Sequence, residues 1–204
     1  IKRFIYAASS STYGDNNDLP KIEGVEGKPL SPYAVTKLVN EIYSEIFYKV
    51  YNFSSIGLRY FNVFGPKQNP NNPYAAVIPI FCKNFLNRSQ PTINGSGTIS
   101  RDFTFVENVV QANLKALFNK KIKDHQVYNI ACGKRISLDK IIDLLNKFSG
   151  YNITPIYGEK RQGDIEHSHA NINLAKKDLG YYPLIDFEEG LSILFSENIS
   201  NEEN

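Results

Sequence analysis

Residues 31–61 read SPYAVTKLVNEIYSEIFYKVYNFSSIGLRYF, and the pattern within this stretch decides the fold. Ser31 followed by Pro32 is typical of a helix start, because serine caps the first turn and proline fits its first position. From there to about Tyr51, apolar residues recur at helical spacing in two adjacent stripes. One stripe holds Leu38, Ile42, Ile46 and Val50, and the next holds Val39, Tyr43 and Phe47. So wide an apolar face predicts a helix that packs on a sheet.

Apolar segments on either side of this helix have the character of buried strands. Ile1–Ala8 runs into the small polar stretch SSSTYG, and a loop rich in Gly, Asn, Asp and Pro follows from Gly14 to Ser31. Phe53–Phe61 is the second apolar segment, and NVFGP ends it. Strand, long helix and strand in this order predict a right-handed parallel βαβ unit. The chain is therefore expected to have an α/β fold.

The rest of the chain alternates shorter elements beyond a Pro- and Asn-rich loop at 68–74, the best candidate for a domain boundary. Helices are expected at 76–86, 107–118, 138–148, 172–179 and 187–195, and strands at 91–94, 127–131 and 153–157. We expect residues 1–66, with returning segments near 103–131, to form one domain. Residues 67–102 and 132–204 are expected to form a second region.

Composition narrows the possible functions. The 204 residues are 42% hydrophobic, enough for one domain or a domain and a half, and the net charge of +2 comes from well-mixed acids and bases. Without a run of Lys or Arg, we expect no nucleic-acid or anionic-membrane partner. No apolar run approaches the ~20 residues of a membrane helix, and a cytoplasmic location is expected. His167 and His169 have no third ligand beside them in sequence, so no metal site is predicted.

Tyr33 and Lys37 have the clearest chemical potential. Their i, i+4 spacing places the phenol and the ammonium on one helix face, one turn apart. A free phenol, with a pKa near ~10, is a poor base at neutral pH, but a cation held close favours the phenolate. Tyr33 could then take a proton from a sugar hydroxyl while a hydride leaves for a nicotinamide cofactor. Tyr and Lys at this spacing also occur often on solvated helix faces, so the pair alone does not identify an enzyme.

The surrounding motifs make the pair more informative. Ser9 ends the first predicted strand, and ligands gather at the carboxyl ends of strands in parallel α/β sheets. A hydroxyl there can hydrogen-bond both a substrate hydroxyl and the tyrosine. SSSTYG by itself is equally typical of a turn that ends a strand. Strand, SSS, loop, SPYxxxK, strand and RYFNVFGP in this order form a far rarer combination.

With these motifs, the chain resembles the extended short-chain dehydrogenase/reductases of the NAD-dependent epimerase/dehydratase family. Within that family it is most similar to nucleotide-sugar 4-epimerases that act on UDP-N-acetylhexosamines or their uronates. The resemblance extends from Ile1 to about Leu194 and rests on AASSSTYGD, LSPYAVTK, IGLRYFNVFGP, YAAVIPIF, INGSGTISRDFTFVENV and RQGDIEHSHA. It implies the C-terminal half of an NAD(P)-binding Rossmann domain, a doubly wound parallel sheet, with a smaller α/β domain that binds a UDP-sugar.

The resemblance also implies roles for single residues. Ser9 corresponds to the catalytic Ser/Thr, Tyr33 to the base, and Lys37 to the lysine that holds the nicotinamide ribose. The implied NAD-binding residues are Ala7, Tyr33, Lys37, Tyr60 and Val63. The implied substrate-binding residues are Ser10, Ser11, Asn62, Ala76, Val77, Asn94, Arg101, Arg161, Asp164 and Ser168. Of these, Arg161 and Asp164 resemble a pair that grips the diphosphate and the uridine ribose, and a guanidinium suits phosphate oxygens.

One departure from the family is large. The family begins with a strand, a Gly-rich turn that cradles the pyrophosphate, and an acidic residue for the adenosine ribose. None of these is present, and Gly95-Ser96-Gly97 has the wrong context for that turn. Four strands of the family fold and their helices are absent, on the order of 100 residues at ~30 per βαβ unit. We expect this cofactor half to belong to the same protein or to a separate chain. The 204 residues alone should hold NAD poorly, and their opening strand should expose an unpaired edge.

Other functions stay open. In 4,6-dehydratases and decarboxylases of this fold, a carboxylate usually follows the catalytic Ser/Thr, where this chain has Ser10 and Ser11; these reactions are disfavoured. A UDP-glucose or UDP-uronate epimerase is a closer alternative. From another class, a non-catalytic, truncated nucleotide-sugar-binding paralogue is possible, although Ser9, Tyr33 and Lys37 argue against decay. The resemblance also implies a homodimer formed through the helix that begins at Tyr33 and a neighbouring helix, which these residues do not include.

Ser168 carries the expectation about the sugar. In the resembling epimerases, the residue four positions after the Asp of Arg-x-Gly-Asp lies beside the C2 substituent, and Arg161-Gln162-Gly163-Asp164 sets that register. A serine leaves room for an N-acetyl group and can hydrogen-bond it. We therefore expect 4-epimerisation of UDP-GlcNAc and UDP-GalNAc through a 4-keto intermediate, in preference to UDP-glucose. A loop serine that faces solvent is the alternative at this position.

Overall fold

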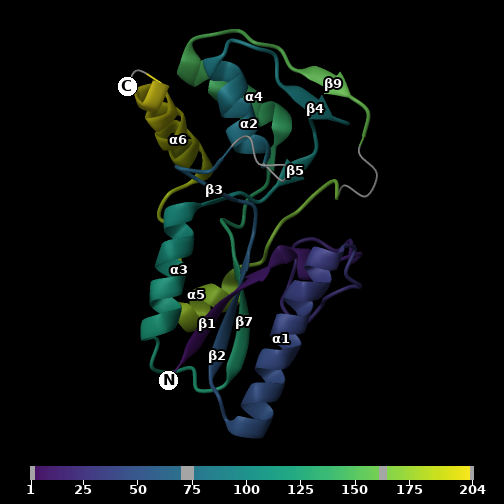
Figure 1. Ribbon diagram of the computed structural model, residues 1–204, viewed down its shortest axis with the longest axis vertical. Helices are drawn as coiled ribbons and strands as arrows, with labels where there is room; N and C mark the ends of the chain where they lie inside the picture. Colours follow the sequence, from purple (N-terminus) through teal and green to yellow (C-terminus); the bar gives the residue numbers. More distant parts are fainter. Residues whose placement is uncertain (1–2, 70–75, 161–164, 203–204) are drawn as a thin grey trace.

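The computed structural model describes residues 3–69, 76–160 and 165–202, which form two lobes (Figure 1). The first, which we call the sheet lobe, contains β1 (Phe4–Ser9), β2 (Ser55–Tyr60), β7 (His125–Ile130), α1 (Pro32–Tyr51), α3 (Val106–Phe118) and α5 (Asn173–Leu179). The second lobe contains α2 (Val77–Leu86), α4 (Leu138–Ser149), α6 (Phe187–Glu202) and the strand pairs β4 (Thr92–Asn94) with β9 (Ile156–Gly158) and β5 (Ser100–Arg101) with β8 (Ile136–Ser137). Strands β3 (Val63–Phe64) and β6 (Thr104–Phe105) pair where the lobes meet (Figure 1).

The sheet is parallel, in the order β1-β2-β7. Ser9 is in register with Tyr60, and Tyr60 with Ile130, so the three strands end together at the edge that faces the second lobe (Figure 1). The predicted βαβ unit is confirmed as β1, α1 and β2. Within the described residues, β1 pairs on one side only.

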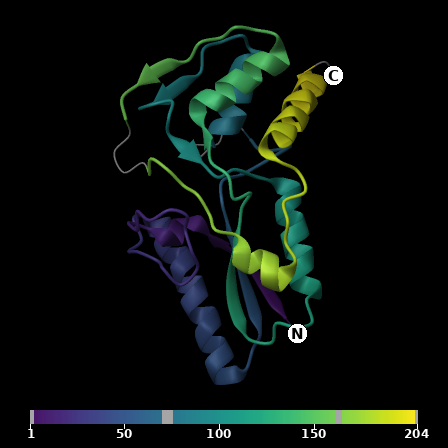
Figure 2. The same ribbon diagram turned by 180° about the vertical axis from the view of Figure 1, so that it is seen from behind.

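Helices cover both faces of this sheet. Alternate residues of a strand point to opposite faces. Ile56 and Leu58 of β2 pack in a buried cluster with Val109 of α3, whereas Arg59 points to the other face and bonds Glu41 of α1. Helices α3 and α5 therefore lie on one face and α1 on the other (Figures 1 and 2).

Helix α1 begins as predicted but does not bury the face that we expected. The Ser31 hydroxyl accepts a hydrogen bond from the backbone N–H of Ala34 at 3.1 Å, and the helix ends at Asn52 in the left-handed conformation (φ 54°). Its buried residues are Ala34 and Glu41. Its exposed large apolar residues are Tyr33, Val35, Val39, Ile42, Tyr43, Ile46, Phe47, Val50 and Tyr51.

The prediction that the wide apolar face of α1 packs on the sheet is therefore wrong. The sheet-facing side is narrow and partly polar, because the sheet offers it the polar partners Arg59 and the Ala7 carbonyl. The apolar stripes point away from the sheet. Although α1 is 20 residues long, no helix in the described ranges is apolar enough over sufficient length to cross a membrane.

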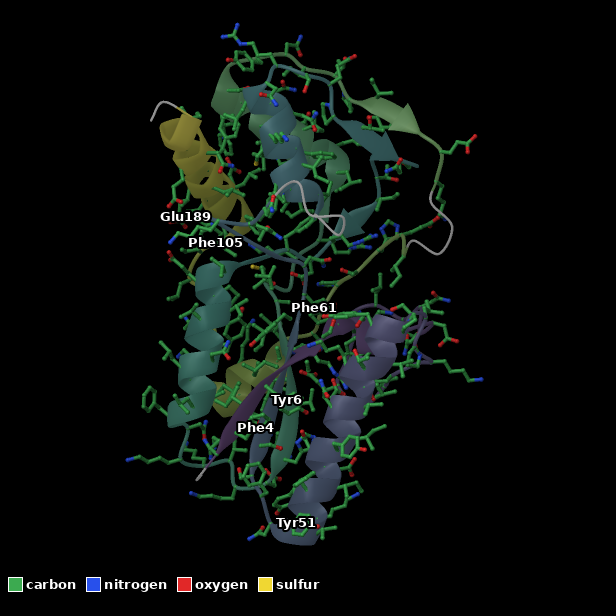
Figure 3. All side chains as sticks on the ribbon, viewed as in Figure 1. Phe4, Tyr6, Tyr51, Phe61, Phe105 and Glu189 are labelled. Atoms are coloured by element: carbon green, nitrogen blue, oxygen red, sulfur yellow. The ribbon has the colours of Figure 1, made fainter. Side chains whose placement is uncertain are left out.

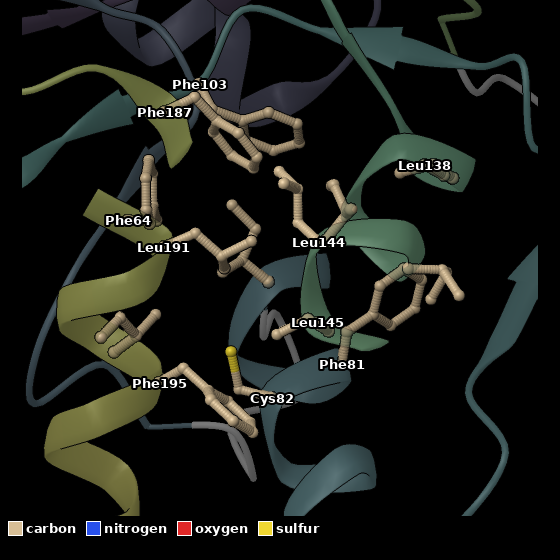
Figure 4. Close-up of a cluster of buried hydrophobic side chains, with 14 of the residues drawn as sticks. Phe64, Phe81, Cys82, Phe103, Leu138, Leu144, Leu145, Phe187, Leu191 and Phe195 are labelled. Atoms are coloured by element: carbon tan, nitrogen blue, oxygen red, sulfur yellow. The ribbon is translucent and has the colours of Figure 1, made fainter. Parts of the chain in front are cut away.

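The second lobe has its own hydrophobic core between α2, α4 and α6 (Figure 4). Helix α4 starts at the predicted cap, where the Ser137 hydroxyl accepts from the N–H of Lys140 at 3.2 Å, and it stops at Gly150 in the left-handed conformation. The side chains labelled in Figure 4 are Phe64, Phe81, Cys82, Phe103, Leu138, Leu144, Leu145, Phe187, Leu191 and Phe195.

Helix α5 belongs by its packing to the sheet lobe. Ala175 and Leu179 share a buried cluster with Ile56 and Tyr128 of the sheet. The chain returns to this lobe through the segment 165–172, whose Ala170 and Ile172 join the same cluster. This return brings residues near 168 to the edge where the strands end.

Candidate active site

The carboxyl ends of β1 and β2 and the start of α1 meet at one place, the edge where ligands bind in parallel α/β folds (Figure 1). Tyr33 is the second residue of α1 and Lys37 follows one turn later. The Lys37 Nζ donates a hydrogen bond to the carbonyl oxygen of Ala7 at 2.9 Å. The same Nζ lies 5.6 Å from the centre of the Tyr33 ring. Tyr33 is 57% exposed, so its phenol is open to a ligand.

Ser9 closes β1 and caps the short 3₁₀ helix η1 (Ser10–Tyr13). Its Oγ accepts hydrogen bonds from the backbone N–H of Ser11 at 3.2 Å and from the Ser11 hydroxyl at 2.9 Å. A hydroxyl that accepts twice still has its own proton to donate. Ser10 is half-buried in η1. The proton of the Ser9 hydroxyl is therefore not used by these two hydrogen bonds.

Tyr60 and Val63 lie close to this edge in different ways. The backbone of Tyr60 is in register with Ser9, but its side chain points to the α3 face, where its hydroxyl exchanges hydrogen bonds with Asn113 at 3.0 and 3.2 Å. Burial raises the pKa of Tyr60. Val63 belongs to β3 and pairs with Thr104. The Tyr60 side chain is therefore bound to α3, and its backbone lies at the end of β2.

A cavity of about 590 Å³ opens between β3, α2, β4 and β5. Six of the predicted binding residues line it: Asn62, Val63, Ala76, Val77, Asn94 and Arg101. Arg101 is oriented by hydrogen bonds from its Nη1 to the carbonyl oxygens of Ser100 (3.1 Å) and Glu166 (2.9 Å). Arg161 and Asp164 lie outside the described residues. Five of the predicted substrate residues thus line one cavity, and Tyr33 is not part of its lining.

Asn62 and Ser168 meet between this cavity and the strand ends. Asn62 has a positive φ of 36°, which asparagine tolerates better than most residues and which ends the β2 segment. Its Nδ2 donates to the Ser168 hydroxyl at 3.1 Å and to the carbonyl oxygen of Asp102 at 2.8 Å. The N–H of Asp102 also points at the Ser168 hydroxyl, at 3.4 Å. The Ser168 hydroxyl is therefore held as an acceptor, and its own proton can be donated.

Asp102 is the residue that sequence reasoning missed. It is fully buried, and its carboxylate accepts from the N–H of Cys132 at 3.0 Å and of Ala170 at 3.2 Å. Burial, which these hydrogen bonds only partly offset, raises the pKa of Asp102 to about 6. The carboxylate ties the end of β7 to the segment that carries Ser168. A charged residue inside the apolar run SRDFTFV was the signal that could have marked it.

Gly97, His167 and His169, for which no cofactor or metal role was predicted, each have a structural role. A Cβ on Gly97 would lie 1.7 Å from the Asp139 carboxylate, so this glycine makes room for the start of α4. His167 bonds the Ser100 hydroxyl at 2.9 Å, and His169 bonds the Gly133 carbonyl oxygen at 3.0 Å. In the ranges that the structure describes, no three His, Cys, Asp or Glu side chains are grouped to hold a metal.

The residues at the strand ends fit one part of an NAD molecule. An exposed phenol, an ammonium and a serine hydroxyl can bind a hydroxyl-rich ribose and a nicotinamide. The other part of the cofactor has no counterpart in the described residues, because Gly95 and Gly97 serve the second lobe.

Comparisons with known proteins identify the family of the chain. The model of the NAD dependent epimerase/dehydratase family matches residues 1–131. A putative UDP-glucose 4-epimerase of Methanocaldococcus jannaschii is 35% identical over 94% of this chain and 61% of its own length. A UDP-N-acetylglucosamine 4-epimerase from Methanobrevibacter ruminantium, solved with UDP-N-acetylmuramic acid, is 38% identical with a TM-score of 0.92, over 98% of this chain and 64% of its own.

A UDP-glucuronic acid 4-epimerase from Bacillus cereus, solved with UDP-glucuronic acid and NAD, is 31% identical with a TM-score of 0.89. The match covers 98% of this chain and 62% of that protein. This chain therefore spans less than two thirds of the length of each of these relatives.

Proposed function

The chain belongs to the NAD dependent epimerase/dehydratase family, and from this premise we propose that it is the catalytic and substrate-binding part of a UDP-sugar 4-epimerase. The observation that carries the proposal is the bond between Lys37 Nζ and the Ala7 carbonyl. It holds the ammonium 5.6 Å from the centre of the Tyr33 ring, near the end of β1, the strand that Ser9 closes. A cation, an exposed phenol and a hydroxyl donor are the groups that proton abstraction from a sugar hydroxyl requires.

In this proposal Tyr33 takes the proton from the sugar's C4 hydroxyl, and Ser9 donates a hydrogen bond to the oxygen that loses it. Lys37 favours the ionised phenol by its charge and holds the ribose of the cofactor. NAD, when bound, supplies the acceptor and later the donor of the C4 hydride. The proton returns from Tyr33 after the 4-keto sugar has turned over, so the pocket must hold the UDP part firmly and the sugar loosely.

The cavity between β3 and α2 is suited to tight binding of the UDP part of the substrate. Its Arg101 guanidinium matches phosphate oxygens, and the amide of Asn94 can pair with a uracil edge. Asn62 lines the cavity and follows the end of β2 by two residues, so we assign it to the diphosphate. Arg161 and Asp164 complete the proposed UDP site.

For the sugar we propose an N-acetylhexosamine, with conversion between UDP-GlcNAc and UDP-GalNAc. Ser168 supports this choice, because its side chain is small and its hydroxyl can donate a hydrogen bond to an acetamide oxygen. UDP-glucose and UDP-glucuronate stay as alternatives, since relatives named for these sugars are similar as well. Ser10 and Ser11 stand where a dehydratase would use a carboxylate, which favours epimerisation.

We also propose a cofactor half that pairs with β1, and a homodimer. β1 offers one unpaired edge among the described strands, which a further parallel strand of the sheet would cover. The exposed apolar side of α1 favours contact with a second copy of the chain. Its Ile42, Tyr43 and Ile46 are each about half exposed or more. Exposed apolar patches of this kind are typical of protein–protein interfaces.

The experiment is an equilibrium assay of the native protein with NAD. UDP-GlcNAc should give UDP-GalNAc, with parallel reactions on UDP-glucose and UDP-glucuronate to rank the sugars. Turnover of none of the three, together with tight UDP binding in a calorimeter, would instead identify the non-catalytic paralogue.

A further inference from the structure

Arg59 and Glu41 form a buried ion pair between the sheet and α1. Arg59 is 3% exposed and Glu41 6%. The Arg59 Nε donates to Glu41 Oε1 at 2.9 Å, and its Nη2 donates to Oε2 at 2.5 Å. We propose that Arg59 is a positioning residue: by holding Glu41, it fixes α1 where Tyr33 and Lys37 can act. The inference rests on the proposed function, and it names the sheet residue on which that function depends.

β2 presents Arg59 beside the place where Lys37 is bound. Arg59 is in register with Ala8 of β1, next to Ala7, whose carbonyl accepts the hydrogen bond from Lys37. On the same face of β2, two residues earlier, Gly57 lies against the ring of Tyr6, and a Cβ there would be 2.6 Å from that ring. Arg59 is thus the polar group of β2 closest to the site on this face.

Few other contacts of α1 could replace this bond. Among the residues of α1, all of which the structure describes, only Ala34 and Glu41 are buried, and Lys37 between them is half-buried. The apolar stripes of the helix face away from the sheet. Over the first half of α1, the attachment to the sheet is therefore largely polar, through Lys37 and Glu41. If the bond of Glu41 is lost, the polar bond to the sheet that remains over this half of the helix belongs to Lys37, a residue of the proposed site itself.

The surroundings of Arg59 also make it a rigid anchor. Its Nη1 pairs with Glu26 of the loop between Gly14 and Ser31. Its guanidinium lies 4.9 Å from the centre of the Tyr13 ring, and the Tyr13 hydroxyl donates to Asn129 of β7 at 2.7 Å. A two-point bond to a carboxylate resists sliding of the helix along its axis, which the single-point bond of a lysine does not.

The test compares Arg59→Lys and Glu41→Gln in the native protein with NAD. The matched control is Lys49→Gln, which removes an exposed ion pair with Glu45 on the same helix. Two properties are measured: amide hydrogen exchange across α1 and across β7, and kcat and KM for the UDP-sugar. Exchange follows local opening, so it separates a displaced helix from a destabilised protein.

We expect both variants to raise exchange at residues 35–41 by ~10-fold, with β7 unchanged. We expect kcat to fall by ~10²-fold while KM changes little, because small displacements of reacting groups act on the chemical step. The control should match the wild type in all readouts. Wild-type exchange and kcat in both variants would overturn the proposal, and so would an equal loss of protection in α1 and β7.

If Arg59→Lys does not fold, Glu41→Gln decides, because it keeps the shape of the side chain and one acceptor oxygen. If the wild-type protein epimerises none of the UDP-sugars, the proposed function fails. The exchange data then still show whether Arg59 holds the start of α1.

Discussion

The ammonium of Lys37 donates a hydrogen bond to the carbonyl oxygen of Ala7, at 2.9 Å, across the gap between α1 and the last residues of β1. This contact fixes the charge of Lys37 relative to Tyr33, whose ring centre is 5.6 Å away. It leaves the Tyr33 hydroxyl at the surface, where a ligand can approach it. Lys37 is thus held by the sheet, while Tyr33 stays exposed, as its proposed role of base requires.

Replacing Tyr33 with phenylalanine tests the assignment of the base. Tyr33→Phe should lower turnover of the native enzyme by at least ~10²-fold, because the lost proton acceptor acts on the chemical step. Binding of the UDP-sugar, measured by calorimetry, should be almost unchanged. Tyr51→Phe is the control, since Tyr51 is exposed at the far end of the same helix (Figure 3). Near-normal turnover by Tyr33→Phe would contradict the assignment.

The second prediction concerns the cofactor. A polypeptide of residues 1–204 should bind NAD weakly or not at all, because a pyrophosphate needs a glycine-rich turn at a helix start. In the described residues the two glycines of Gly95-Ser96-Gly97 serve other purposes: Gly97 makes room for Asp139, and Gly95 donates its N–H to Gly158. Isothermal calorimetry checks this expectation. A dissociation constant in the low-micromolar range would refute the argument.

The sequence predicted well whatever depends on local pattern. The cap at Ser31, the helix that follows and the strands around it were found from periodicity and capping residues, and all are present. The spacing of apolar residues does not predict which element packs on each face of α1. It shows that Ile42 and Ile46 lie on one side, but the sheet takes the side with Ala34 and Glu41 instead.

Contacts between distant residues were the part that the sequence could not provide. Glu41 reads as a solvated helix charge until β2 places Arg59 beside it, 18 residues later. Asp102 acquires its role from partners 30 and 68 residues away, Cys132 and Ala170. The position of Ser168 beside Asn62 likewise depends on a contact over 106 residues. Such pairings need the topology of the chain, which single-sequence patterns do not contain.

Asp102 leads to a prediction about pH. Burial raises its pKa from the ordinary 3.8 to about 6, so the folded protein binds this proton more tightly than the unfolded chain does. The contribution of Asp102 to the free energy of unfolding is therefore fully present below about pH 4 and is lost as the pH rises through about 6.

Asp102→Asn should remove this dependence. It should also destabilise the protein by ~1–3 kcal/mol. Each carboxylate oxygen accepts from one buried N–H, of Cys132 or of Ala170, and in asparagine the NH₂ group would replace one of these acceptors. Urea unfolding at several pH values measures both effects. The difference in unfolding free energy between wild type and variant should narrow from pH 4 to pH 6 and stay constant above. Parallel curves over that range would show that Asp102 does not titrate there.

The last prediction concerns the choice of sugar and rests on the half-buried side chain of Ser168 beside Asn62. The hydroxyl of Ser168 is held by Asn62 Nδ2 at 3.1 Å and faces the N–H of Asp102 at 3.4 Å, so a larger side chain there must point into the space next to Asn62. Ser168→Tyr should therefore abolish conversion of UDP-GlcNAc, whose N-acetyl group needs that space, and should spare UDP-glucose.

Ser168→Ala distinguishes the effect of the small side chain from the effect of the hydrogen bond that its hydroxyl can donate. It keeps the space and removes one donor, so turnover of UDP-GlcNAc should fall by ~10-fold at most, the value of a single hydrogen bond. Chromatographic assays of both sugars with wild type and the two variants give the comparison. If the wild type converted UDP-glucose far faster than UDP-GlcNAc, the argument from Ser168 would fail. The assignment of Tyr33 as the base would be unaffected, because it depends on Lys37 and Ser9 and on no contact with the C2 substituent.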